Sequence, residues 1–205
     1  MTSKRELERR LASVADFTAP IPELEQYRTP ADIAAHVIHR AALEGDIEGR
    51  TVVDLGTGTG MFAIGAAIAG AGHIVGMEAD AAALEQARRN AAGQGVTRDI
   101  DWVIADATRS PLCVEGATVL MNPPFGAHRS NRHADRAFLE TASRIASVSH
   151  SFHNEGSRDF VESFVADRGG TITHAFQATI SLPRQFTHHD REAEPIDAEV
   201  YRIEW

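Results

Sequence analysis

The chain lacks several features that would point to a secreted or membrane protein. Its 205 residues include one cysteine, Cys113, which excludes an internal disulfide framework and fits a reducing cytoplasm. No run of about 18 or more apolar residues is present, so we expect no membrane-spanning helix. Residues 1–10 are charged and lack the apolar stretch of a secretory signal. We therefore expect a cytoplasmic protein.

Lysine is nearly absent, because Lys4 is the only one among 20 basic residues and the rest are arginines. The net charge of −9 argues by itself against general affinity for nucleic acid. An acidic, lysine-poor surface favours solubility in concentrated salt, so a halophilic source competes with compositional drift as the explanation. In concentrated salt the bulk attraction between protein and RNA is screened. Local contacts would then carry binding, and the net charge does not exclude an RNA substrate.

Beyond residue 50 the sequence alternates between short apolar strands and helices. We expect strands at 51–55, 73–77, 100–104, 117–121 and 148–152, and helices at 61–69, 80–92, 135–146 and 156–167. Residues 171–182 and 198–205 alternate in polarity without a helix between them, which predicts an antiparallel pair. The pattern implies an α/β fold, with a mostly parallel seven-stranded sheet, a C-terminal antiparallel hairpin and helices on both faces.

The residues before the first strand are predicted to be helical. Residues 2–15 place apolar side chains at three- and four-residue spacings. A second helix is expected after Thr29, which suits the N-cap position, and Pro30, which suits the first helical position. The length fits one domain over the whole chain, with 1–23 as a helical extension and 24–205 as the core.

A glycine-rich turn, Asp54-x-Gly56-x-Gly58-x-Gly60, follows the first strand. Closely spaced glycines let the backbone approach a ligand that a Cβ would exclude. The spacing differs from the GxGxxG of dinucleotide enzymes and suits S-adenosylmethionine, which has no pyrophosphate; a structural turn is the alternative. Glu78 ends the next strand, where an acid can accept both ribose hydroxyls, and Asp106 ends the third, where a carboxylate can receive the adenine amine. We expect an S-adenosylmethionine site at this edge of the sheet.

The fourth strand ends in Asn122-Pro123-Pro124-Phe125-Gly126. A planar exocyclic amine is a poor nucleophile because its lone pair is delocalised into the ring. If the Asn122 side chain and the Pro123 carbonyl accept its N–H bonds, the lone pair shifts toward the sulfonium methyl. Proline fixes φ and holds its carbonyl rigidly, and Phe125 can stack on the base. The motif predicts methylation of a planar nitrogen by positioning, without a strong general base.

This motif leaves the acceptor open, because methyltransferases acting on adenine and on glutamine amides of proteins share the Asn-Pro-Pro-aromatic sequence. A module that keeps the donor site without turnover is a further alternative. The Arg- and His-rich segments after the motif and near residue 190 favour RNA over a protein acceptor.

A longer series of motifs resembles one family. The series is Leu24-Glu25-Gln26-Tyr27, Thr29, Ile33-Ala34-Ala35, Asp54-Leu55-Gly56, Ala71-Gly72, Val75-Gly76, Met121-Asn122-Pro123-Pro124-Phe125-Gly126 and Asp135-x-x-Phe138-Leu139. In this order it resembles the archaeal and eukaryotic family of methyltransferase-like protein 5, small-subunit ribosomal RNA adenine methyltransferases with a Rossmann-like class I fold. The resemblance runs from about Leu24 to the C-terminus.

The resemblance implies N6-methylation of one adenosine in small-subunit ribosomal RNA, with S-adenosylmethionine as donor. The implied catalytic residues are Asn122, Pro123, Pro124 and Phe125. The implied donor-binding residues are Gln26, Thr29, Asp54, Gly56, Thr57, Gly58, Gly60, Glu78, Ala79, Asp106, Ala107 and Asn122. Among them, Gln26, Thr29 and the glycine turn should contact the methionine end of the donor.

The chain departs from the family in three places. Glu78 replaces the more usual Asp, and Thr57 and Thr59 stand where relatives often have cysteines. The late loop has Arg and His residues in place of a lysine-rich stretch. The expected RNA contacts are Phe125, Arg129, Arg132, Arg184, Phe186 and His188, with solvated loops as the alternative.

Two further expectations concern partners and metals. Eukaryotic members of the family work with a small zinc-containing activator that pairs with an edge strand, which here would be 100–104. Trp102 on that strand is either an interface residue or covered by the fold. The ten histidines form no convincing ligand set, so we expect no metal in the chain itself.

Overall fold

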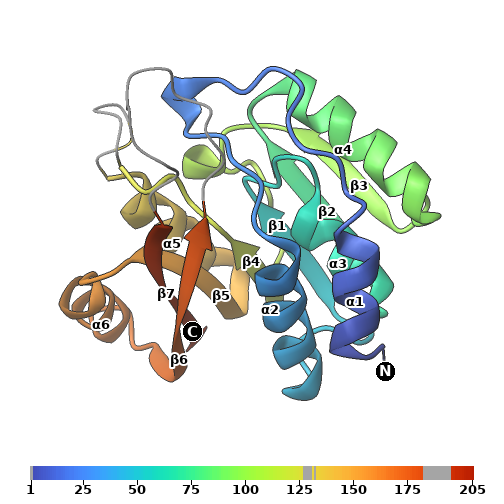
Figure 1. Cartoon of the computed structure of the whole chain (residues 1–205). Helices are drawn as coiled ribbons and strands as arrows, with labels where there is room; N and C mark the ends of the chain where they lie inside the picture. Colours follow the sequence, from blue (N-terminus) through green and yellow to red (C-terminus); the bar gives the residue numbers. More distant parts are fainter. Residues whose placement is uncertain (1, 127–130, 132, 182–194) are drawn as a thin grey trace.

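The structure is a computed structural model that describes residues 2–126, 131, 133–181 and 195–205. Seven strands form one sheet in the order β3-β2-β1-β4-β5-β7-β6 (Figure 1). Their bounds are β1 Thr51–Leu55, β2 His73–Glu78, β3 Ile100–Ile104, β4 Ala117–Met121, β5 Ala146–Asn154, β6 Thr171–Ser181 and β7 Pro195–Glu204. Strands β1 to β5 are parallel, and β7 is antiparallel to both β5 and β6. The predicted sheet with its C-terminal hairpin is confirmed.

Helices cover both faces of this sheet (Figure 1). The helices are α1 Lys4–Leu11, α2 Ala31–Leu43, α3 Met61–Ile68, α4 Ala81–Gln94, α5 Ala134–Ile145 and α6 Arg158–Ala166, with short 3-10 turns η1 Pro22–Leu24 and η2 Ala107–Arg109. One core lies beneath α1, α2 and α3, and the other beneath α5 and α6. No helix in the described part of the chain is long and apolar enough to cross a membrane.

The N-terminal helix is part of the first core. Ser3 caps it by accepting a hydrogen bond from the Glu6 backbone, and Leu7 and Leu11 are fully buried against α2 and α3. After α1 the chain crosses over the sheet edge before it enters α2 (Figure 1). The side chain of Asn90 ties this crossing segment down, because it bonds both the N–H and the carbonyl of Ala15 and also the carbonyl of Thr59.

The predicted cap of α2 is wrong. Thr29 makes no cap bond, and the helix begins at Ala31 after Pro30. The Thr29 hydroxyl instead accepts a hydrogen bond from the side chain of Asn122, far away in sequence. A tertiary contact at the end of β4 has therefore displaced the local capping bond.

The strand register brings the predicted site residues together. Leu55 at the end of β1 lies opposite Met77 of β2 on one side and Met121 of β4 on the other. The residues that follow these three positions are Gly56, Glu78 and Asn122. They meet at one edge of the sheet, the edge at which ligands bind in folds of this kind.

Candidate active site

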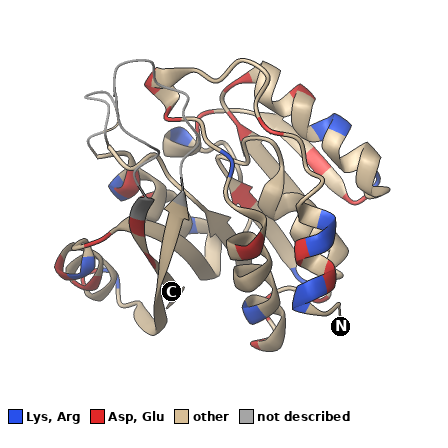
Figure 2. Cartoon of the chain, in the orientation of Figure 1, with Lys and Arg blue, Asp and Glu red and all other residues tan. Residues whose placement is uncertain are grey.

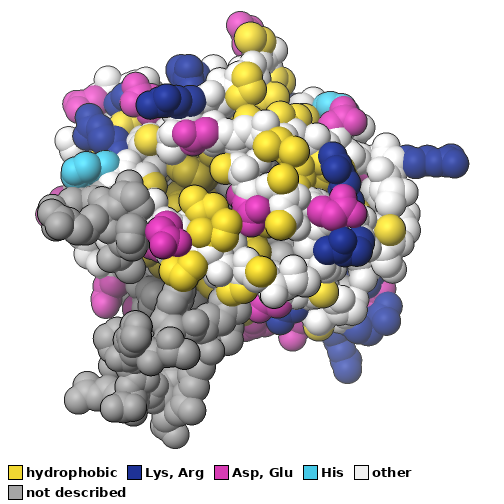
Figure 3. All heavy atoms as spheres, turned by 90° about the horizontal axis from the view of Figure 1, so that it is seen from above, with side chains coloured by type: hydrophobic (Ala, Val, Ile, Leu, Met, Phe, Trp, Pro, Cys, Tyr) yellow, Lys and Arg dark blue, Asp and Glu magenta, His cyan; other side chains and the backbone are white. Residues whose placement is uncertain are grey.

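A pocket of about 550 Å³ opens at the carboxyl edge of the sheet. Its lining comes from the N-terminal crossing segment, the glycine turn, the ends of β2, β3 and β4, and the start of α5. Seen from above, this face has hydrophobic side chains near its middle, with both acidic and basic side chains around them (Figure 3). Acidic residues also recur on the loops above the sheet (Figure 2). The volume is in the range of pockets for small-molecule ligands.

The glycine turn is held between two aromatic rings. Gly56 has φ +71°, and a Cβ there would lie 3.1 Å from Cε1 of Phe138. Gly58 has φ +53°, and its Cβ would lie 2.9 Å from Cζ of Phe17. Both the backbone angles and the lack of space require glycine. The turn therefore presents bare backbone to the pocket, as predicted for a donor site.

Asp54 supports this turn from beneath and lies outside the pocket lining. Its Oδ2 accepts hydrogen bonds from the Thr57 hydroxyl at 2.6 Å and from the Ala63 N–H at 2.8 Å. Burial raises the pKa of the Asp54 carboxyl to about 7, more than these hydrogen bonds lower it. Asp54 thus fixes the turn to the first residues of α3.

Glu78 lines the pocket at the end of β2 and is 8% exposed. Its carboxylate accepts from the N–H groups of Gly58 at 2.9 Å, Ala79 at 2.9 Å and Asp80 at 3.0 Å. Burial raises the pKa of Glu78 despite these hydrogen bonds. A carboxylate has about four acceptor positions, so one remains for a ribose hydroxyl.

Two further donor-site residues are fixed by their own neighbours. Gln26 donates from Nε2 to Asp80 at 2.9 Å, and its Oε1 accepts from the Ile21 N–H at 2.8 Å. Asp106 is exposed and caps η2 by accepting from the N–H and the hydroxyl of Thr108. Both side chains line the pocket.

The acceptor motif lies at the other side of the pocket. The Asn122 Oδ1 accepts from the Tyr27 hydroxyl at 3.1 Å, and its Nδ2 donates to the Thr29 hydroxyl at 3.1 Å. Phe125 stacks on Tyr27, with the ring centroids 5.7 Å apart and the planes at 25°. The Asn154 side chain donates to the Phe125 carbonyl at 2.7 Å. The motif is therefore held from several elements.

The structure brings most of the predicted site residues to one pocket. Those in its lining are Gln26, Thr29, Gly56, Thr57, Gly58, Glu78, Ala79, Asp106, Ala107, Asn122 and Pro124. Those outside the lining are Asp54, Gly60, Pro123 and Phe125. The predicted RNA contacts Arg129, Arg132, Arg184, Phe186 and His188 lie outside the described residues.

Sequence reasoning missed four aromatic residues of the lining: Phe17, Tyr27, Phe62 and Phe138. Tyr27 and Phe138 occur in the motifs that carry the family resemblance, but the motifs gave them no role. Phe17 had only a weak signal, as a lone aromatic in a segment bounded by prolines. Across the described residues, no group of three or more His, Cys, Asp or Glu could hold a metal ion.

Trp102 is partly covered by the fold. A Cβ on Gly76 would lie 2.5 Å from its Cζ3, and a Cβ on Gly60 would lie 3.2 Å from its Cη2. The ring thus packs over two glycines of neighbouring elements. On the same outermost strand, Ile104 is 60% exposed.

Comparison with known proteins identifies the family. Residues 29–149 match the methyltransferase small domain family. The rRNA N(6)-adenosine-methyltransferase Mettl5 of Drosophila melanogaster is 33% identical over 98% of this chain and 95% of its own length. An uncharacterized protein of Methanocaldococcus jannaschii is 34% identical over 100% and 95%.

The chain belongs to the methyltransferase-like protein 5 family. The crystal structure of a protein from Pyrococcus horikoshii superposes on this chain with a TM-score of 0.90. The two sequences are 36% identical, and the match covers 100% of this chain and 98% of the other. The protein is an S-adenosylmethionine-dependent methyltransferase with a class I fold. As in other family members, the donor supplies the methyl group.

The residues of this chain fit that donor. Gly56 and Gly58 line the pocket with backbone alone, and Gln26, Glu78 and Asp106 supply polar groups along it. Burial raises the pKa of Glu78, and a ligand with a net positive charge would favour its ionised form.

Proposed function

We propose that this methyltransferase modifies the N6 amine of an adenosine in small-subunit ribosomal RNA. The observation that supports this most is the Asn122 amide, fixed in the lining of the donor pocket. Two relatives that align with 97–98% of this chain, from Drosophila melanogaster and Danio rerio, are named rRNA N(6)-adenosine-methyltransferases. A site built for a planar amine and relatives of nearly full length thus agree.

The chemistry follows from the acceptor motif. Asn122 Oδ1 keeps a second lone pair beside its bond from Tyr27 and accepts one N6–H of the adenosine, while the Pro123 carbonyl accepts the other. These bonds draw the N6 lone pair out of the ring and toward the methyl group. Phe125 fixes the plane of the base by stacking. Positioning supplies most of the rate. The N6–methyl bond forms as the sulfonium–methyl bond breaks, and the surplus proton then passes from N6 to solvent water, so no strong base is needed.

The base must leave its stack to reach this site. An adenosine inside a helix presents only the edges of its base, so we propose a flipped or single-stranded target. Because the chain carries a net charge of −9, local contacts must guide the RNA. We assign these to Phe125 and to the residues Arg129, Arg132, Arg184, Phe186 and His188, of which the last five lie outside the described residues.

We also propose a small zinc-containing activator as a partner. The outermost strand β3 offers an edge for pairing, and the exposed Ile104 side chain supports an apolar contact there. Trp102 packs against the fold, which supports the second of the two interpretations of this residue, so we assign the apolar contact to Ile104.

The deciding experiment follows methyl transfer into two fractions. Small subunits from a strain that lacks the gene are incubated with labelled S-adenosylmethionine and the purified enzyme, with and without the activator. We expect label in ribosomal RNA, recovered as N6-methyladenosine by mass spectrometry of nucleosides. The Asn122→Ala variant is the inactive control.

The two alternatives give different results in this assay. Label in a protein fraction as methylated glutamine would support a protein methyltransferase with the same motif. Donor binding without label in either fraction would support a binding module. Equal N6-methyladenosine in ribosomal RNA from wild-type and deletion strains would reject the proposed substrate.

A further inference from the structure

We infer that Tyr27 is a positioning residue that holds the Asn122 amide and the Phe125 ring in place for the acceptor. The inference rests on the proposed function to the extent that Asn122 and Phe125 receive the base. Three observations carry it: the hydroxyl contact, the ring contact and the backbone of the turn that bears Tyr27.

The hydroxyl contact orients the Asn122 side chain. An amide on a free side chain can rotate, but here Tyr27 donates to Oδ1 and Thr29 accepts from Nδ2, both at 3.1 Å. The two hydroxyls belong to the same short segment and flank the amide from both ends. Because burial raises the pKa of Tyr27 above its ordinary value, the phenol remains a neutral donor. This keeps the oxygen of Asn122, which accepts from N6, in one orientation.

The ring contact orients Phe125. The Tyr27 and Phe125 rings are nearly parallel, with an interplanar angle of 25° and centroids 5.7 Å apart. This is an offset-stacked arrangement, one of the geometries that aromatic pairs prefer. One face of Phe125 is therefore supported by Tyr27, so the ring has a defined plane against which a base can stack. Tyr27 thus contacts both residues that we assign to the acceptor.

The backbone of the turn is strained in a way that serves these contacts. Glu25 has φ +50°, the only positive φ of a non-glycine residue in the described part of the chain. Its carboxylate accepts from the Gly126 N–H at 3.0 Å and from Asn131 Nδ2 at 3.1 Å. Residues held in this region of φ and ψ cluster at functional sites. The segment from Glu25 to Thr29 therefore hydrogen-bonds the acceptor motif at both its Asn122 end and its Gly126 end.

A pair of matched variants tests the role of the hydroxyl. Tyr27→Phe keeps the ring and removes the hydroxyl. Tyr201→Phe makes the same change in the only other tyrosine, which is 2% exposed and donates to Glu199 at 2.7 Å, outside the pocket lining. We expect Tyr27→Phe to lower kcat about tenfold, because the variant loses one hydrogen bond that orients the Asn122 amide. The KM for RNA and the affinity for S-adenosylmethionine should change less than about twofold, and Tyr201→Phe should match the wild type.

A second variant tests the ring. Tyr27→Leu removes the stacking surface as well as the hydroxyl, and we expect kcat to fall further than in Tyr27→Phe. Thermal midpoints and donor affinities are measured for every variant. A parallel loss of kcat, donor affinity and thermal midpoint in Tyr27→Phe would mean a merely structural role and would overturn the inference.

A readout without turnover keeps this test separate from the identity of the substrate. The side-chain amide of Asn122 is assigned in nitrogen-15 spectra as the signal that Asn122→Asp removes. We expect Tyr27→Phe to shift this signal and speed its hydrogen exchange, and Tyr201→Phe to leave both unchanged. An absence of RNA methylation by the wild type would reject the proposed function, while the Asn122 signal would still report on Tyr27. An unchanged signal together with unchanged kcat would overturn the role of Tyr27.

Discussion

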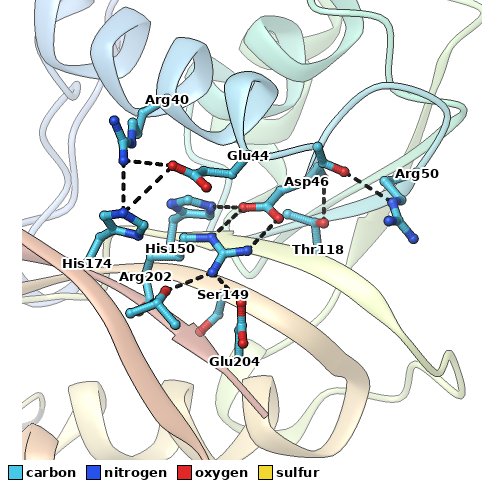
Figure 4. A network of polar contacts seen from close by, with 12 residues as sticks. Arg40, Glu44, Asp46, Arg50, Thr118, Ser149, His150, His174, Arg202 and Glu204 are labelled. Atoms are coloured by element: carbon cyan, nitrogen blue, oxygen red, sulfur yellow. Dashed lines mark hydrogen bonds and ion pairs between the residues drawn. The ribbon is translucent and has the colours of Figure 1, made fainter.

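The two ends of strand β1 carry buried carboxylates with opposite surroundings. Asp46, before the strand, is bound by His150 at 2.9 Å and by Arg202 at 2.8 and 2.9 Å (Figure 4). Asp54, near the other end, is bound only by a hydroxyl and a backbone N–H. No ion pair to Asp54 or Glu78 occurs among the described residues. Among the described residues, basic side chains therefore pair with the carboxylate before β1, whereas none pairs with the two carboxylates at the carboxyl ends of the strands.

The pKa values record this difference. Burial alone would raise the pKa of Asp46, but hydrogen bonds from His150 and Arg202 outweigh it and lower the pKa to about 2. Burial raises the pKa of Asp54 to about 7 and also raises that of Glu78. Buried carboxyls with perturbed pKa values are typical of functional sites. We therefore expect the network around Asp46 to act on stability, and the carboxyls at the other end of the strands to act on donor binding.

The largest effect that we predict is the loss of activity in Asn122→Ala. The change removes the acceptor of the N6–H bond, and loss of a hydrogen-bonding group aimed at the reacting centre lowers kcat by about a hundredfold to a thousandfold. Donor affinity, measured by titration calorimetry, should change less than about threefold. Turnover at the wild-type rate in this variant would contradict the proposed mechanism.

Changes in the network around Asp46, before β1, should lower stability and leave activity unchanged. Arg202→Met leaves Asp46 buried without its arginine partner, and loss of one member of a buried ion pair costs about 3 kcal/mol. We expect this loss in the free energy of unfolding from urea titrations, with kcat and donor affinity unchanged below the unfolding transition. Arg158→Met is the matched control, because Arg158 pairs with Glu162 on the surface of α6 and its loss should be hard to detect. An equal loss in the free energy of unfolding in both variants would show that the Asp46 network stabilises the fold no more than a surface ion pair does.

Much of this arrangement was predictable from the sequence. The alternation of strands and helices gave the sheet, and parallel strands necessarily bring Gly56, Glu78 and Asn122 to one edge. Glu78 ends an apolar strand and the other two directly follow one, so their positions depended on local pattern alone. The donor site and the acceptor motif could therefore be placed side by side before any contact was known.

The remaining contacts depend on packing between distant segments. Phe17 reaches the glycine turn because the N-terminal segment crosses over it, held by Asn90. The Asp46 network joins residues more than 100 positions apart, and no periodicity marks His150 or Arg202. Thr29 is a further example, because its residue type and position suit a helix cap but its hydroxyl bonds Asn122 instead. The local sequence pattern thus predicts which residues lie at the strand ends, whereas tertiary packing decides which side chains they contact.

The smallest effect, and the sharpest contrast between the two edges, is in the pH dependence of stability. The folded pKa of Asp54, about 7, is above the unfolded value of about 3.9, so the folded donor-free protein keeps a proton that the unfolded chain loses. Its contribution to stability therefore falls as pH rises from about 4 to about 7. Asp54→Asn removes this proton exchange, and the free energy of unfolding of the wild type relative to the variant should fall by about 1 kcal/mol between pH 6 and pH 8.

Asp46, whose folded pKa is lowered to about 2, has the opposite sign, because its contribution is complete above about pH 4 and is lost as the pH falls toward 2. Parallel stability curves for wild type and Asp54→Asn between pH 6 and pH 8 would show that Asp54 is already ionised there, and the contrast between the two ends of β1 would be lost.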